Sequence, residues 1–185
     1  MRRVAVTDGM AKEAVKKLEN AGCEVVLEAI DYQNLASGAL GEFDAVIVRS
    51  ATKLTREILE ASQPRLKVVA RAGVGVDNID VKAASEFGIP VVNSPRSSTQ
   101  SVVELTIGHL LGSLRHIPQA DRSLRSGEWA KSEFMGTELY GKRLGLIGFG
   151  RIAQGVARVA QAFGMEVHSY DPYLPPSIAK KFGVT

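Results

Sequence analysis

Cysteine, histidine and aromatic residues are all scarce in this sequence of 185 residues. Its single cysteine, Cys23, cannot form an intramolecular disulfide and suits a reducing compartment. One cysteine and three histidines are also too few for a typical structural zinc site. Aromatic residues make up 6% of the chain, which leaves little for stacking nucleic-acid bases. Disulfide scaffolds, zinc modules and single-strand binding platforms are therefore excluded or disfavoured.

A strong charge excess and long apolar runs are absent as well. Lys and Arg number 23 against 20 Asp and Glu, so the net charge of +3 is too small to indicate a nucleic-acid partner. Apolar stretches such as Leu144–Ile147 have the length of a strand, so no membrane partner is expected. The run Val4–Val6 after the basic start is far shorter than the roughly 7–15 residues of a signal-peptide core. We expect a cytoplasmic protein.

What the chain does contain is an alternation of strand-like and helix-like segments. Hydrophobic residues make up 45% and charged residues 23%, the balance of a globular protein with a core. Parallel strands are usually connected by helices, so the alternation predicts an α/β fold. The predicted strands of the first half are Val4–Val6, Glu24–Leu27, Ala45–Val48, Val68–Ala70 and Val91–Val92, and the helices are Ala11–Asn20, Thr55–Ala61 and Val81–Phe87.

A polar segment, Asn93–Thr99, interrupts the alternation. Its proline and serines predict a loop and a domain boundary, which gives domains 1–95 and 96–185. Ser101 and Glu104 have the spacing of a capping box at the start of a helix.

This helix, from Val102 to about Arg115, is apolar over most of its surface. Such a helix is expected to be buried on more than one side, including against another subunit. A polar helical stretch, Gln119–Ser126, follows it.

A second α/β pattern begins near Lys142. Leu144–Ile147 and Glu166–Tyr170 are predicted strands, and Ile152–Phe163 is the predicted helix between them. The segment Asp171–Pro176 is predicted to be a rigid loop that precedes a short helix.

The residues Gly148–Ala153 match the pattern G-x-G-x-x-G/A. A strand leads into this loop, a helix leads out of it, and Asp171 ends the next strand roughly 20 residues later, as in a dinucleotide-binding fingerprint. Gly148 is expected to allow the tight turn, Gly150 to let a pyrophosphate approach the backbone, and Ala153 to allow close helix packing. The alternative is a plain strand–helix turn without a ligand.

Asp171 is the residue that discriminates between cofactors in this interpretation. A carboxylate at this position accepts hydrogen bonds from ribose hydroxyls and repels a 2′-phosphate, which favours NAD over NADP. Arg151 is expected either to contact the pyrophosphate or to be a solvated residue of the first helical turn.

A second glycine loop, Arg71–Asn78, also follows a predicted strand. Gly73 and Gly75 let the backbone turn its amides toward a small anion such as a carboxylate, although a tight turn without a ligand explains them equally well. Asp77, Asn78 or Asp80 is expected to cap the helix that follows.

Arg49 ends another strand, at the sheet edge where such folds collect ligands. It is expected either to bind a carboxylate or phosphate or to form a surface salt bridge.

None of the histidines has the context of an acid–base catalyst. His109 lies within the apolar helix and is expected to be packed or at an interface. His116 lies near the end of that helix, where its charge complements the dipole. His168 is predicted to be structural, and Cys23 has no basic neighbour in the sequence to activate it.

Seven segments together resemble the D-isomer-specific 2-hydroxyacid dehydrogenases. They cover essentially the whole chain, and they are Val48–Thr52, Arg71–Asn78, Gly88–Asn93, Ser101–Glu104, Phe134–Leu139, Leu144–Ile152 and Tyr170–Pro172. Phe134–Leu139 is most similar to the members that act on 3-phospho-D-glycerate. Ala153 departs from the family, which usually has glycine there.

The resemblance implies a flavodoxin-like substrate domain followed by the first part of a Rossmann NAD-binding domain. It implies a substrate site formed by Arg49, Ser50, Arg71, Gly73, Val74 and Gly75. It implies that NAD is held by Val74, Gly148, Phe149, Gly150, Arg151, Ile152, Asp171 and Pro172. The helix at about 99–116 would form a homodimer or tetramer, and Lys131 would reach the neighbouring active site.

The reaction implied is the NAD-dependent oxidation of 3-phospho-D-glycerate to 3-phosphohydroxypyruvate, the first step of the phosphorylated route to serine. The catalytic Arg, Glu and His of the family would lie beyond residue 185, so no catalytic residue is assigned and the isolated span is expected to be inactive. Three alternatives remain: a glyoxylate or hydroxypyruvate reductase of the same family, a non-catalytic NAD-sensing protein like the corepressors on this fold, and a naturally short, inactive remnant.

Overall fold

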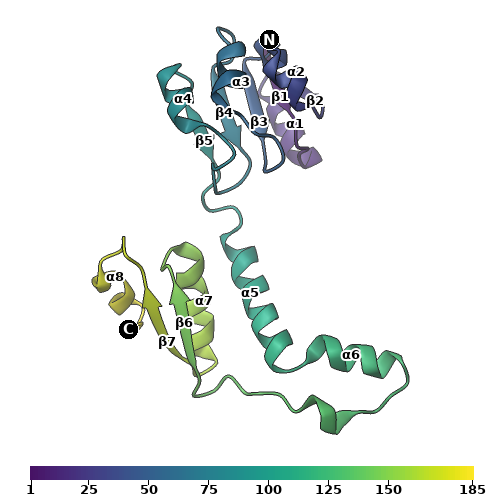
Figure 1. Cartoon of the computed structure of the whole chain (residues 1–185), viewed down its shortest axis with the longest axis vertical. Coiled ribbons are helices and arrows are strands. Elements are labelled where there is room, and N and C mark those ends of the chain that lie inside the picture. Colours follow the sequence, from purple (N-terminus) through teal and green to yellow (C-terminus); the bar gives the residue numbers. More distant parts are fainter. The chain divides into compact units, whose positions relative to one another are not determined.

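The computed structural model describes residues 1–185, and the chain divides into two compact units, Met1–Ser97 and Ser98–Thr185 (Figure 1). The division falls within the polar segment Asn93–Thr99. Each unit has its own hydrophobic core and is described by itself. None of the helices combines the length and the hydropathy needed to span a membrane.

The first unit is built on a parallel sheet of five strands in the order β2-β1-β3-β4-β5. The strands are β1 Arg2–Val6, β2 Cys23–Leu27, β3 Ala45–Val48, β4 Val68–Arg71 and β5 Val91–Asn93. This order is the flavodoxin-like one, in which the direction of winding reverses between β1 and β3. The predicted α/β class and its flavodoxin-like first part are confirmed. The reversal places the candidate ligand edge at the carboxyl ends of β1, β3 and β4.

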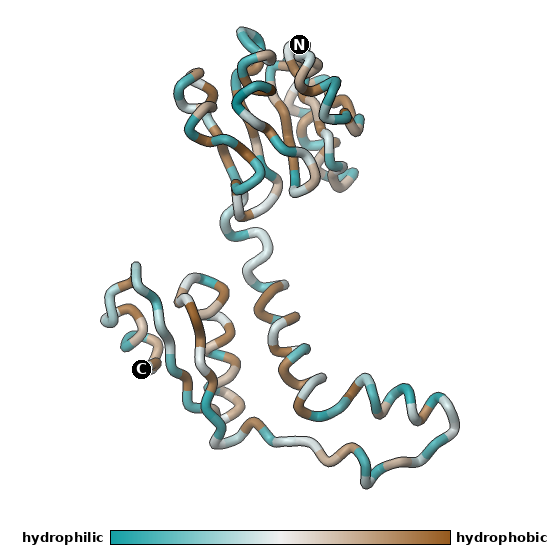
Figure 2. The backbone as a smooth tube through the Cα atoms, viewed as in Figure 1, coloured by the Kyte–Doolittle hydropathy of each residue, from teal (hydrophilic) through white to brown (hydrophobic).

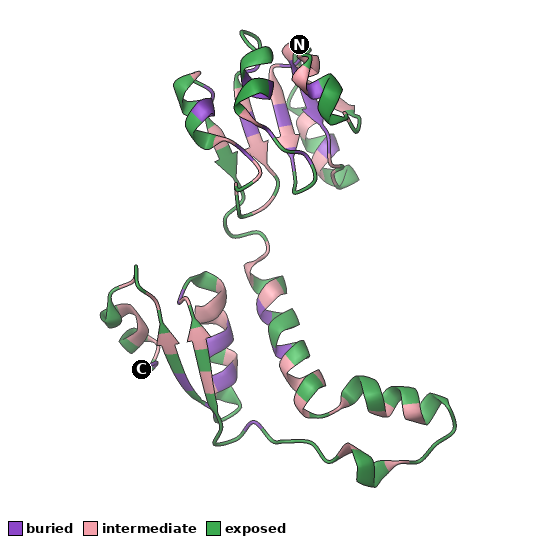
Figure 3. Cartoon of the chain, in the orientation of Figure 1, coloured by how far each residue is buried: buried purple, intermediate pink, exposed green.

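The helical segments of this unit are α1 Lys12–Asn20, α2 Tyr32–Ala36, η1 Ala39–Glu42, α3 Arg56–Ala61 and α4 Val81–Glu86. Asp80 caps α4 by accepting a hydrogen bond of 2.8 Å from the Ala83 amide, so one of the three predicted capping residues is confirmed. The short segments α2 and η1 are not predicted from the sequence, because five and four residues are too few to show a helical period. Val46, Val69 and Ile58 are fully buried. Buried positions of this unit lie on both its strands and its helices (Figure 3).

The second unit contains two parallel strands, β6 Arg143–Ile147 and β7 Glu166–Tyr170, with helices beside them. The helices are α5 Thr99–Leu114, α6 Ile117–Arg125, η2 Lys131–Phe134, α7 Arg151–Ala162 and α8 Pro176–Lys181. The α7 helix packs its buried face against the strands and against α5. Gly155 on α7 allows the close approach of α7 to α5, since a Cβ atom there would lie 2.5 Å from Cγ2 of Val103.

The predicted capping box is wrong. The α5 helix begins at Thr99, after Ser98, so Ser101 lies inside the helix rather than at its cap. The Glu104 carboxylate accepts a hydrogen bond of 2.9 Å from the Gln100 side chain instead of returning to a capping amide. The physical reason is that the polar loop ends about one turn before the position that the Ser-x-x-Glu spacing indicates.

The expected burial of α5 on more than one side is not met by contacts within this chain. Val103 and Ile107 are buried, but Leu105 is 59% exposed and His109 is exposed rather than packed. Hydrophobic residues are spread along α5, whereas α6 is mostly hydrophilic (Figure 2). The α6 helix starts at Ile117, two residues before its predicted start, because the fixed φ of Pro118 suits a first helical turn.

Candidate functional site

The predicted anion-binding residues of the first unit lie at the carboxyl edge of its sheet. Arg49 and Ser50 follow β3, and the glycine loop follows the adjacent strand β4, with Val48 opposite Arg71 in the register. Arg49 and Ser50 are exposed, and Nε of Arg71 donates a hydrogen bond of 3.2 Å to the Arg49 carbonyl oxygen. The Arg71 guanidinium therefore lies against the backbone of Arg49, and both arginines belong to the same edge of the sheet.

The glycine loop after β4 is held by bonds within the unit. The Gly73 amide donates to the Arg71 carbonyl at 2.8 Å, and the Gly73 carbonyl accepts from the Ser94 amide at 2.9 Å. A Cβ atom on Gly73 would lie 1.8 Å from Nη1 of Arg71, so this glycine lets the arginine side chain fold over the loop. The Gly73 amide thus stabilises the turn, and an anion at this edge has to be met by other groups.

Two polar residues near this edge are missed by sequence reasoning. Asp8 follows β1, and its carboxylate accepts hydrogen bonds from the amides of Arg49 and Thr52 at 2.6 and 3.1 Å. Asn78, expected only as a possible helix cap, donates from Nδ2 to the carbonyl oxygens of Arg49 and Thr52 at 2.8 and 2.6 Å. The sequence does contain one signal that could have identified Asp8, which is its position just after a strand at the point where the winding reverses.

Burial tends to raise the pKa of Asp8. Hydrogen bonds from the Thr52 hydroxyl and from the amides of Thr52, Arg49 and Ala51 outweigh burial and hold the pKa below its ordinary value. Asp8 is therefore a carboxylate at neutral pH.

The glycine loop of the second unit joins β6 to α7. Gly148 has φ of +84°, a left-handed conformation that favours glycine, and its amide donates to the Tyr170 carbonyl at 2.7 Å. A Cβ atom on Gly150 would meet no heavy atom within 4 Å, so the backbone at this position faces open space. Phe149 is 1% exposed and packs edge-on against Phe182, so this residue anchors the loop to the core of the unit.

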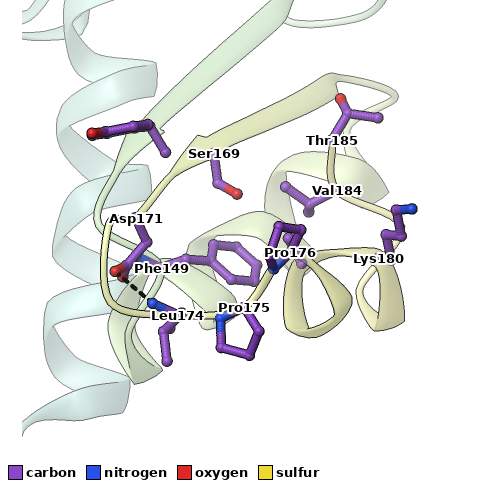
Figure 4. Close-up of a pocket in the computed structure, with 11 residues that line it drawn as sticks. Phe149, Ser169, Asp171, Leu174, Pro175, Pro176, Lys180, Val184 and Thr185 are labelled. Carbon is purple, nitrogen blue, oxygen red and sulfur yellow. Dashed lines mark hydrogen bonds between the residues drawn. The ribbon is translucent and has the colours of Figure 1, made fainter.

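Asp171 ties the end of β7 to this loop. Its Oδ2 accepts from the Phe149 amide at 2.7 Å, and its Oδ1 accepts from the amides of Tyr173 and Leu174 at 2.9 and 3.1 Å. Figure 4 shows the bond to Leu174. These hydrogen bonds, that of Phe149 first, hold the pKa of Asp171 below its ordinary value. A carboxylate offers about four acceptor positions, so three amides leave one position on Oδ2 for a further donor such as a hydroxyl.

A hollow of about 300 Å³ lies beside Asp171. Leu174, Pro175, Pro176 and Val184 supply much of its apolar lining, and the ring of Phe149 lies between Asp171 and Pro176 (Figure 4). Pro172 is exposed at the start of this loop, and Ile152 packs into the interior of the unit from the first turn of α7.

These residues fit a dinucleotide by their chemistry. The open backbone at Gly150 leads into the N-terminus of a 12-residue helix, where amide hydrogens and the helix dipole favour phosphate. At the end of the neighbouring strand, Asp171 provides an acceptor suited to a ribose hydroxyl.

Comparison with known proteins places the whole chain within one group. The family model described as D-isomer specific 2-hydroxyacid dehydrogenase, catalytic domain, matches residues 4–179. The chain is 49% identical over 184 residues to D-3-phosphoglycerate dehydrogenase of Methanocaldococcus jannaschii, covering 100% of this chain and 35% of that protein. It is also 49% identical over 174 residues to hydroxypyruvate reductase of Thermotoga maritima, covering 94% of this chain and 56% of that protein.

A solved relative carries a nicotinamide dinucleotide. The structure of an acyclic imino acid reductase in complex with NADPH and D-Arg superposes with a TM-score of 0.82 at 30% identity, covering 94% of this chain and 57% of that chain. The chain thus spans about a third of the M. jannaschii protein and little more than half of the other two.

Proposed function

The chain belongs to the D-isomer-specific 2-hydroxyacid dehydrogenase family, and on that premise we propose that the protein oxidises 3-phospho-D-glycerate to 3-phosphohydroxypyruvate with NAD. This reaction is the first step of the phosphorylated route to serine. The observation that carries the proposal is the pair of arginines, Arg49 and Arg71, at the carboxyl edge of the first sheet. Two guanidinium groups suit a substrate that has a phosphate in addition to its carboxylate.

In this proposal the first unit binds and orients the substrate. Arg49 and Ser50 hold one acidic group, and Arg71 assists with the phosphate. Gly73 shapes the turn after β4, and the backbone of Val74 and Gly75 in that turn completes the anion site. Val74 is 38% exposed, and its carbonyl oxygen accepts a hydrogen bond of 2.6 Å from the Asn93 side chain, which holds this turn in place.

The second unit binds NAD, which supplies the hydride acceptor. Gly148, Gly150 and the backbone of Phe149 form the turn, Arg151 and Ile152 begin α7, and Asp171 accepts from the ribose with Pro172 beside it. Asp171 opposes a 2′-phosphate by charge, so we propose NAD rather than the NADPH of the imino acid reductase.

The alternative within the family is a hydroxypyruvate reductase, which the Thermotoga maritima relative supports at the same identity. The two reactions differ in one feature of the substrate, its phosphate. The substrate panel that separates them is therefore 3-phospho-D-glycerate against D-glycerate.

The test is an assay of NADH formation by the intact protein with each substrate. We expect kcat/KM for 3-phospho-D-glycerate to exceed that for D-glycerate by at least about 100-fold, since a charge-assisted hydrogen-bond pair contributes about 1.5–3 kcal/mol per bond. Arg71→Gln should reduce this preference. Equal rates for the two substrates would favour the hydroxypyruvate reductase.

We also propose that the protein forms a homodimer through α5 and the segment 117–135, here called the arm. None of the α6 or η2 residues in the arm is buried, and Leu124, Trp129 and Met135 are 59%, 79% and 84% exposed. Lys131 and Trp129 line a hollow of about 280 Å³ in the arm. Exposed apolar side chains of this size are typical of an interaction surface.

A further inference from the structure

The loop that carries Arg49 and Ser50 has no regular secondary structure. It leaves β3 after Val48 and reaches the buried side chain of Thr52 before α3 begins. Arg49 and Ser50 are exposed, so their own side chains are not packed in a way that fixes the loop. A loop that binds an anion in a defined orientation has to be held by neighbouring groups.

Asp8 holds the amide side of this loop. One carboxylate oxygen, Oδ2, accepts from the amides of both Arg49 and Thr52, and the other, Oδ1, accepts from the Thr52 hydroxyl at 2.5 Å. The Thr52 hydroxyl also lies 2.8 Å from the hydroxyl of Thr7, which is 6% exposed. The first and last residues of the loop are thereby fixed to the end of β1.

Asn78 holds the carbonyl side of the same two residues. Its Nδ2 group donates one hydrogen to the Arg49 carbonyl and the other to the Thr52 carbonyl. Both contacts require a donor, so a carboxylate at position 78 would face two carbonyl oxygens and repel them. The Arg49 and Thr52 peptide groups are therefore held from both sides, by acceptors on Asp8 and by donors on Asn78.

We propose that Asp8 and Asn78 are positioning residues for substrate binding, which keep Arg49 and Ser50 in the orientation that receives the substrate's acid group. This inference rests on the proposed function. Neither side chain needs to touch the substrate, since each acts through the backbone of the loop.

The experiment compares Asp8→Asn with Asp44→Asn in the intact protein. Asp44 is a matched control because it lies just before β3, at the opposite end of the strand from Arg49, and its carboxylate also accepts a backbone amide, that of Arg3, at 2.7 Å. We expect Asp8→Asn to raise KM for 3-phospho-D-glycerate at least about 10-fold with KM for NAD unchanged, and Asp44→Asn to leave both within about twofold. A general loss of stability would affect the two variants alike.

Asn78→Asp is the second variant, and it covers the case in which Asp8→Asn does not fold. It should raise the same KM by a similar factor and accelerate amide hydrogen exchange at Arg49 and Thr52. An unchanged KM for 3-phospho-D-glycerate in a folded variant, or an equal rise in Asp44→Asn, would overturn the inference.

The positioning role and the proposed reaction are tested by different measurements. The dissociation constant for 3-phospho-D-glycerate, measured by calorimetry, decides the positioning role even if the wild-type protein binds this acid without oxidising it. Binding without turnover therefore contradicts only the proposed reaction, whereas a wild-type protein that does not bind the acid contradicts both.

Discussion

Two glycines of the loop before α7 have different physical roles. Gly148 is needed for its backbone, since φ of +84° is strained for any residue with a Cβ atom. Gly150 has an ordinary extended backbone and open space where a Cβ atom would lie. Substitution of Gly148 therefore tests folding, whereas substitution of Gly150 tests ligand binding.

We expect Gly150→Ala to weaken NAD binding about 10-fold or more while leaving the melting temperature unchanged. Gly148→Ala should instead destabilise the protein by about 1–2 kcal/mol, the cost of a left-handed conformation at a non-glycine residue. Calorimetric titration with NAD and thermal unfolding measure the two effects. Unchanged NAD binding in Gly150→Ala would contradict the proposed pyrophosphate approach.

Three carboxylates make stability dependent on acid pH. Amide hydrogen bonds from Phe149 to Asp171 and from Arg3 to Asp44 lower the pKa of each group, and hydrogen bonds from the Thr52 hydroxyl and neighbouring amides lower that of Asp8 against the effect of burial.

A pKa that is lower in the folded state stabilises the fold above the unfolded value of about 3.9 and loses this effect as the pH falls through the folded value. We expect a constant melting temperature from about pH 5 to 7 and a steep decrease below about pH 4. Circular dichroism measures this profile, and Asp171→Asn should reduce its slope. A melting temperature that rises on acidification contradicts the assignment.

At the scale of elements, the contact between α5 and α7 depends on Gly155. The buried side chain of Val103 occupies the space that a Cβ atom on Gly155 would need. Helix propensity alone favours alanine over glycine, so packing and propensity oppose each other at this position.

Gly155→Ala should destabilise the second unit by about 1–3 kcal/mol, because overpacking displaces α7 from α5. Gly108→Ala on α5 is the matched control, since a Cβ atom there meets nothing within 4 Å, and it should stabilise by up to about 1 kcal/mol. Urea unfolding of both variants measures the difference. Equal stabilisation by both alanines would show that Val103 moves aside at little cost.

At the scale of the whole molecule, the arm has large apolar side chains and no buried residues in its helical segments. Trp129→Ser should raise the dissociation constant of the proposed dimer about 10-fold or more, since a buried tryptophan is often a dominant interface residue. Tyr173→Ser, at a side chain that is 92% exposed outside the arm, is the control and should have no effect. Sedimentation velocity distinguishes these results, and a wild-type monomer would contradict the proposal.

The strands and the glycine loop of the second unit are predictable from the sequence because their signals are local. Runs such as Ala45–Val48 and Leu144–Ile147 are apolar enough to indicate strands. The spacing of Gly148, Gly150 and Asp171 likewise indicates a loop between a strand and a helix. The predicted capping box at Ser101 was wrong because a four-residue pattern says little about where the preceding loop ends.

The sequence by itself determined the α/β class, because hydrophobic period is a property of neighbouring residues. Its motifs also carried the resemblance to the family, and that resemblance implied the flavodoxin-like first part. Only the tertiary structure decided that Asp8 and Asn78 meet at Arg49 and Thr52, across 41 and 29 residues of chain. It also decided that Asp171 shares its carboxylate among three amides and that Leu105 on α5 is exposed. Such contacts depend on how strands and helices are placed beside one another, and a linear pattern does not contain that placement.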